Sequence, residues 1–170
     1  MDKVLSIDPS INNIGFAFFY QSKLVEYDTR KTWKRSPTPP VPVRLKEAHS
    51  IITNFCELFE PDVIVIEDFQ FRSNDLPWTC PNCKFKNPYG RNGDNLKKLV
   101  FSIGAVIASV PAQVEVVMIK PQKWKGPAKK KNTLKSVRDL FGVENVKDDT
   151  ADAIMLGHFY LESQKQMRIV

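Results

Sequence analysis

Short apolar runs separated by turn residues predict that the first 28 residues form strands. Residues 3–8, 14–20 and 23–28 are rich in β-branched and aromatic side chains, which favour strands. Only Gln21 and Ser22 separate the second run from the third, and this is the length of a tight hairpin connection. We therefore expect three consecutive hairpin strands at the start of the fold.

The pattern then changes to alternating helices and strands. Apolar residues recur at helical spacing over 44–60, and the proline-rich stretch 36–43 before them is expected to be an extended linker. Residues 62–69 form a continuous apolar run, typical of a strand that is covered on both faces. Further helices are expected over 95–110, 133–142 and 148–164, and a further strand over 113–119. This order predicts an α/β fold with one mixed sheet.

Residues 72–94 interrupt the pattern with polar residues, Gly, Pro and Asn, and they have no clear period. A long loop inside a compact domain is usually functional or disordered, so we interpret the chain as one domain, 1–170, with a loop insertion at about 72–94. The loop contains Cys80 and Cys83, which are spaced like half of a zinc ribbon. A structural zinc takes four ligands, and no second such pair exists. We therefore expect a flexible basic loop in preference to a zinc site at Cys80 and Cys83.

Acidic residues end two of the expected strands. Asp8 ends the first apolar run and Glu67 ends the run at 62–69, although a buried carboxylate is costly unless it is paired or binds a metal. Asp149 and Asp152 lie three residues apart at the start of the last helix, hence on one face. Taken singly, these residues are as readily turn or helix-start acids. Together they predict a site for divalent ions such as Mg²⁺, which prefers oxygen ligands.

The charge of the chain is unevenly distributed. The formal net charge is +6, and residues 120–138 contain basic side chains but no acid. These basic residues are Lys120, Lys123, Lys125, Lys129, Lys130, Lys131, Lys135 and Arg138. Such a stretch suits contact with nucleic-acid phosphates, and the alternative is a solvated surface loop. Trp124, within the run, either stacks on a base or covers the core.

The sequence gives no sign of a membrane protein. No apolar stretch approaches the roughly 20 residues of a membrane span, and the N-terminal residues lack a signal-peptide pattern. We therefore expect a cytoplasmic protein of a bacterial or phage-infected host cell, without a membrane partner.

Three segments together resemble the RuvC family of Holliday junction resolvases, endonucleases of the ribonuclease H-like fold. They read IDPSINNIGFAFF, RLKEAHSIITNFCELFEPDVIVIEDFQF and DDTADAIMLG, and the resemblance, which suggests a phage-type member, runs through most of the chain. It implies an α/β ribonuclease H-like fold, with a mixed five-stranded sheet and helices on both faces. Carried over by position, Asp8, Glu67, Asp149 and Asp152 match the catalytic tetrad of the family. Asp148 competes with Asp149, but its spacing to Asp152 fits the family pattern less well.

The resemblance implies a metal-dependent reaction on branched DNA. A homodimer would bind a four-way junction and nick two opposed strands, with two Mg²⁺ or Mn²⁺ ions in each active site. A broader nuclease that also cuts forks, flaps or three-way junctions is the neighbouring interpretation. A DNA-binding protein without cleavage is a third, which the intact set of four carboxylates disfavours.

The resemblance also implies DNA contacts. Lys123 and either Lys130 or Lys131 match functional basic residues of the family, and Lys129 lies in the same run. One of two aromatics that follow Glu67 matches a side chain that stacks on bases near the junction centre. These two candidates are Phe69 and Phe71, and the alternative is that one or both belong to the core.

The apolar helix expected at 95–110 matches the family helix that packs against a second subunit. Its apolar residues occupy nearly every side, and a helix that is apolar all round has to be buried all round. We therefore expect the homodimer interface here, with Ile103 and Ile107 on the side away from the sheet. The alternative is a helix buried within one chain.

Overall fold

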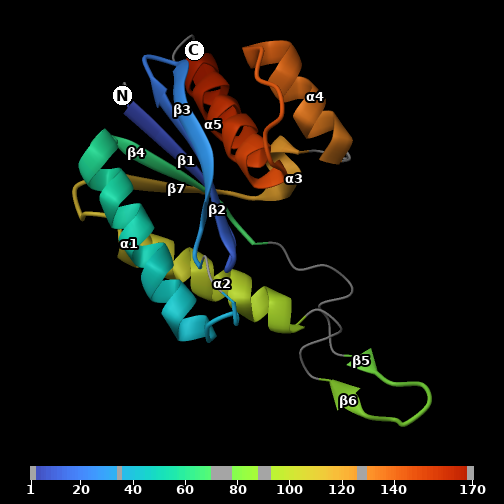
Figure 1. Ribbon diagram of the computed structural model, residues 1–170. Coiled ribbons are helices and arrows are strands. Elements are labelled where there is room, and N and C mark those ends of the chain that lie inside the picture. The colour runs from blue at the N-terminus through green and yellow to red at the C-terminus, as the bar shows by residue number, and fades with distance from the viewer. Residues whose placement is uncertain (1–2, 34–35, 70–77, 88–92, 126–129, 168–170) are drawn as a thin grey trace.

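A five-stranded mixed sheet forms the centre of the protein (Figure 1). The computed structural model describes residues 3–33, 36–69, 78–87, 93–125 and 130–167. The sheet has the order β3-β2-β1-β4-β7. Its strands are β1 (Lys3–Pro9), β2 (Asn13–Tyr20), β3 (Lys23–Lys31), β4 (Val63–Glu67) and β7 (Glu115–Ile119). The first three strands pair antiparallel, whereas β1–β4 and β4–β7 pair parallel, which confirms the predicted mixed sheet.

Helices cover both faces of this sheet, as expected (Figure 1). They are α1 (Val41–Phe59), α2 (Gly93–Ala108), α3 (Pro121–Trp124), α4 (Lys130–Phe141) and α5 (Asp148–Met167). Helices α1 and α2 lie on one face, and α5 lies on the other with α4 beside it. A short separate hairpin consists of β5 (Trp78–Thr79) and β6 (Lys86–Asn87). Among the described residues, no helix combines the length and the apolar character needed to cross a bilayer.

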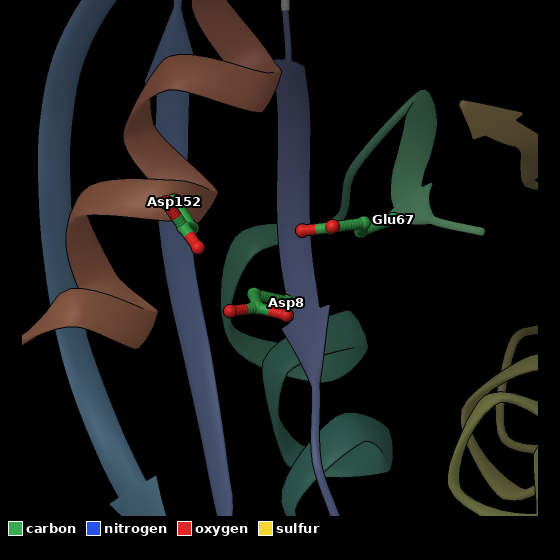
Figure 2. Close-up of side chains that lie close together, drawn as sticks. All are labelled: Asp8, Glu67 and Asp152. Carbon is green, nitrogen blue, oxygen red and sulfur yellow. The ribbon is translucent and has the colours of Figure 1, made fainter. Parts of the chain in front are cut away.

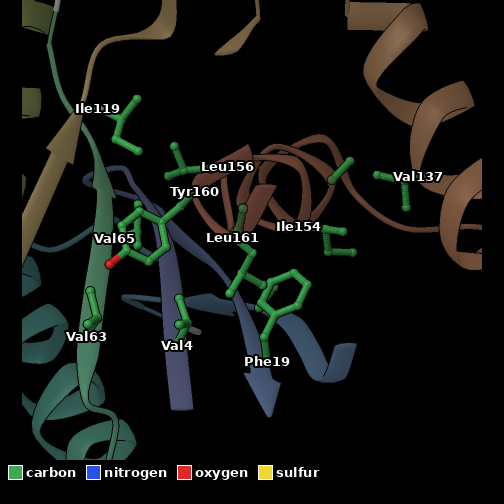
Figure 3. Close-up of a cluster of buried hydrophobic side chains, with 13 residues drawn as sticks. Val4, Phe19, Val63, Val65, Ile119, Val137, Ile154, Leu156, Tyr160 and Leu161 are labelled. Carbon is green, nitrogen blue, oxygen red and sulfur yellow. The ribbon is translucent and has the colours of Figure 1, made fainter. Parts of the chain in front are cut away.

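Alternating side chains of the central strands fill two separate cores. On β1, Leu5 and Ile7 belong to the core under α1 and α2, whereas Val4 belongs to the core under α5. Figure 3 shows the second core, in which Ile154 and Leu156 of α5 contribute side chains above the strands. Successive residues of a strand point to opposite faces of the sheet. A continuous apolar run therefore supplies both cores, as the sequence predicts for the strand at 62–69.

Two helices begin where the sequence predicted irregular chain. Helix α1 begins at Val41, inside the stretch 36–43 that was expected to be extended. Helix α3 begins at Pro121, in the part of the basic stretch 120–138 that precedes the helix predicted at 133–142. In both cases a proline occupies the first turn, where the backbone N–H has no intrahelical acceptor, so its absence costs no hydrogen bond.

Helix α2 buries one face and exposes another. Ile103 is only 4% exposed and belongs to the core on the α1 side, so the expectation that Ile103 lies away from the sheet is wrong. Val106 is fully buried beside it. The outward face instead presents Val100, Phe101 and Ile107, which are 40%, 54% and 39% exposed. The helix is thus apolar on both sides, but only one of them is covered by the residues that the structure describes.

Helix α5 lies unusually close to the sheet because two glycines leave room for it. A Cβ atom at Gly15 of β2 would lie 2.0 Å from the backbone oxygen of Asp149, and one at Gly157 would lie 2.4 Å from the ring of Phe19. The Ser6 hydroxyl of β1 donates a hydrogen bond of 2.7 Å to the carbonyl of Ala153 between these points. The start of α5 therefore lies against the end of the sheet at which β1 finishes.

Substituting Gly15 by Ala is expected to push the start of α5 away from the sheet. The new methyl group would meet a backbone atom, which cannot rotate away as a side chain can. We expect the free energy of unfolding to fall by about 2 kcal/mol, in the range of overpacked cores, as measured by urea denaturation. Unchanged stability in Gly15→Ala would show that the close approach is not required.

Candidate metal centre

Three carboxylates converge at the carboxyl ends of two neighbouring parallel strands. Ile7 of β1 is level with Ile66 of β4, so the residues that follow them, Asp8 and Glu67, reach the same edge of the sheet. Asp152 approaches from α5 on one face. One oxygen from each of Asp8, Glu67 and Asp152 lies within 4.8 Å of the others, and Figure 2 shows the three side chains around a common space.

Asp149 does not belong to this group of three. It lies in the first turn of α5, where its backbone contacts Gly15, and its charge contributes to raising the pKa of Asp8. Asp148, the alternative to Asp149 in the predicted tetrad, is exposed at the start of the same helix. The structure thus assembles three of the four predicted carboxylates and places Asp149 nearby.

The electrostatics of the cluster are those of crowded like charges. Burial raises the pKa of the Asp8 carboxyl well above its usual value, and the negative charges of Glu67 and Asp152 raise it further. The positive charge of Lys125 acts in the opposite direction. A carboxylate that is both desolvated and surrounded by other carboxylates favours a proton or a nearby cation.

Lys125 supplies such a cation within the chain. Its Nζ lies 2.7 Å from Oδ2 of Asp152 and 3.1 Å from both carboxylate oxygens of Glu67. Burial lowers the pKa of Lys125, but the two carboxylates outweigh burial and the pKa is raised overall. The sequence placed Lys125 only in a basic stretch suited to phosphate contact, because a run of lysines gives no sign of which one turns inward.

The chemistry of the cluster fits a divalent metal ion. All three side chains offer hard carboxylate oxygens, the ligands that Mg²⁺ and Mn²⁺ prefer. The ammonium of Lys125 takes the place of a metal ion against two of them. Asp8, Glu67 and Asp152 can therefore hold a metal ion at this end of the sheet.

The predicted DNA-binding residues have different surroundings. Lys123 is exposed on α3, and Phe69 is partly buried against the core under α1 and α2. Lys130 and Lys131 belong to the first turn of α4, and their side chains are not described. Phe71 and Lys129 lie outside the described residues.

The two cysteines of the loop insertion lie between β5 and β6. The backbone N–H and the thiol of Cys83 donate hydrogen bonds that lower the pKa of Cys80, so the two side chains are adjacent. In the part of the chain that the structure describes, the only group of three or more potential metal-ligating side chains is the acidic cluster. Cys80 and Cys83 therefore provide two of the four ligands that a structural zinc needs, and zinc remains a prediction.

The sheet order and the two helical layers are those of the ribonuclease H-like fold, in the form found in RuvC structures. No protein-family model and no curated protein matches the chain by sequence. Among solved structures, it is similar to Thermus thermophilus RuvC in complex with a Holliday junction substrate, with a TM-score of 0.71 and 22% identity over 96% of both chains.

Two further solved structures agree with this fold. A second structure of Thermus thermophilus RuvC has a TM-score of 0.66 and 22% identity, covering 95% of this chain and 96% of that chain. The yeast mitochondrial Holliday junction resolvase Ydc2 has a TM-score of 0.66 and 19% identity, covering 98% of this chain and 80% of that chain. The fold that the sequence resemblance implied is confirmed.

Proposed function

We propose that the protein is a structure-specific endonuclease that resolves four-way DNA junctions by paired, metal-dependent nicks. The observation that carries this proposal is the convergence of Asp8, Glu67 and Asp152 at the carboxyl ends of β1 and β4. The fold is shared with solved structures described as Holliday junction resolvases, which supports the choice of substrate.

The carboxylates would act by holding divalent ions against a DNA phosphate. A pair of Mg²⁺ or Mn²⁺ ions supplies activation of a water and stabilisation of the leaving 3′ oxygen in phosphodiester cleavage. Asp8, Glu67 and Asp152 would hold these ions, and Asp149 in the adjacent turn of α5 would complete the ligand set. The rigid β1 and β4 fix Asp8 and Glu67 before substrate arrives, so little reorganisation is required.

A basic surface next to the cluster would bind the DNA backbone. Lys120 directly precedes α3 and Lys123 lies within it, and both are exposed. Lys135 and Arg138 are exposed on α4. The residue directly after α3, Lys125, reaches the carboxylates themselves. Phosphates bound along α3 would therefore pass close to the acidic cluster, and such contacts fix the position of DNA without reading its sequence.

The outward face of α2 would form a homodimer interface. Val100, Phe101 and Ile107 expose apolar surface there, and a two-fold symmetric pair of subunits buries the same patch on both copies. Two active sites related by a two-fold axis match a substrate that is nicked in two opposed strands.

Cleavage of labelled four-way, three-way, fork and linear DNA with and without Mg²⁺ tests the function. We expect paired nicks in the four-way junction only with metal. In Glu67→Gln, which loses a ligand but no phosphate contact, cleavage should fall by about 100- to 1,000-fold, on the order of the loss of one electrostatic catalytic group. Gel-shift binding should persist.

The matched control is Glu26→Gln, which makes the same charge change at an exposed position of β3. This variant should cut like the wild type. Normal cleavage by Glu67→Gln would remove the metal-site assignment. Equal cutting of forks and three-way junctions would instead identify the broader branched-DNA nuclease, and binding without any cutting would identify a non-cleaving DNA-binding protein.

Sedimentation tests the α2 interface. Phe101→Asp places a charge on the outward face and should convert a dimer to monomer, because a charge buried in an interface without a partner is strongly unfavourable. Leu140→Asp on α4 is the control, since Leu140 is 56% exposed compared with 54% for Phe101. A folded Phe101→Asp protein that stays dimeric would place the interface elsewhere.

A further inference from the structure

Lys125 occupies an unusual position for a residue of a basic surface. It follows α3 directly, and its backbone N–H donates to the carbonyl of Pro121 at 2.8 Å, which continues the short helix by one hydrogen bond. Its side chain turns inward and is 26% exposed. The Nζ lies 4.6 Å from the centre of the Trp124 ring, so an aromatic face borders the ammonium on one side.

The contacts of this ammonium are the oxygens that a metal would need. It binds both carboxylate oxygens of Glu67 and Oδ2 of Asp152, whose side chains are only 12% and 10% exposed. Mg²⁺ would bind the same oxygens at about 2.1 Å. An ammonium about 3 Å from those oxygens would then face a divalent ion at close range with little water to screen them, so the two cations exclude each other.

The cluster needs one of these two cations at any time. Three carboxylates without a cation would repel one another in a partly desolvated site, and breaking a buried ion pair by removing one partner is strongly destabilising. Lys125 provides one positive charge, whereas a divalent ion provides two. Lysine also carries its charge on a flexible four-carbon stem, which allows the ammonium to leave without unfolding of α3.

We infer that Lys125 is an exchangeable internal counter-ion, which bridges Glu67 and Asp152 in the metal-free protein and is displaced when a divalent cation binds. This inference rests on the proposed function for the presence of a metal at the cluster. It adds that the metal-free site is held together by the chain itself and that metal binding is weakened by competition with Lys125.

Metal binding by a series of Lys125 variants tests the exchange, with Mn²⁺ as the probe and electron paramagnetic resonance as the readout of free Mn²⁺. Lys125→Met keeps an unbranched side chain that is one atom shorter and removes the competing charge, so Mn²⁺ should bind about tenfold more tightly than to the wild type, as expected when a competing state is removed. Lys125→Arg replaces the ammonium by a bidentate guanidinium that should be harder to displace, so Mn²⁺ should bind more weakly. Lys46→Met, at an exposed position of α1, has the same net charge as Lys125→Met and should match the wild type.

Thermal unfolding provides a second measurement on the same proteins. Without metal, Lys125→Met should melt below the wild type because its carboxylates lack a counter-ion. With saturating Mn²⁺ it should gain more stability than the wild type does, since tighter binding to the folded state gives a larger shift. If Lys125→Met does not fold without metal, Lys125→Arg retains a positive charge and still tests the predicted order of affinities.

The outcomes separate this inference from the proposed function. Equal Mn²⁺ affinity in the wild type, Lys125→Met and Lys125→Arg would overturn the exchange while leaving the metal site in place. Weaker binding by Lys125→Met would also overturn it, because Lys125 would then assist the metal. Absence of Mn²⁺ binding in all variants and in the wild type would remove the metal site, and with it both proposals.

Discussion

Mutual repulsion of carboxylates at one end of the sheet is the constraint on which the site depends. Asp8 and Glu67 end neighbouring parallel strands, and this geometry keeps them together whether or not their charges are neutralised. Burial and the adjacent acids raise the pKa of Asp8, so the site favours a positive charge. In the structure Lys125 provides that charge to two of the three carboxylates. A divalent cation would neutralise more of the negative charge. The same ion that stabilises the cluster would therefore carry out its proposed chemistry.

The third carboxylate reaches the site because α5 can approach the sheet closely. Gly15 leaves space for the backbone at Asp149, and the hydroxyls of Thr29 and Thr150 hydrogen-bond at 2.6 Å between β3 and the first turn of the helix. These contacts fix the start of α5 against β2 and β3, and Asp152 follows within the next turn. The close packing at Gly15 therefore also determines where the carboxylate of Asp152 lies.

The sequence predicted the parts of this arrangement that follow from periodicity. Continuous apolar runs identified the central strands, and the acids that end two of those runs were expected to share a metal site with those of the last helix. The direction in which a given side chain points was harder to predict. Lys125 lies among many lysines, and only the helical turn that begins at Pro121 aims it at the carboxylates. Ile103 and Ile107 look alike in an apolar helix, yet the sheet covers only Ile103, because which side of α2 is covered depends on contacts distant in sequence.

Diffraction from crystals of the protein soaked in Mn²⁺ tests the central claim most directly, because the anomalous signal locates the metal and the density locates the lysine in one experiment. The account predicts an anomalous peak among the carboxylates of Asp8, Glu67 and Asp152, with the Lys125 ammonium withdrawn from both of its partners. An acidic cluster without a peak, in which Lys125 still bridges Glu67 and Asp152 at a Mn²⁺ concentration that supports cleavage in solution, would contradict it.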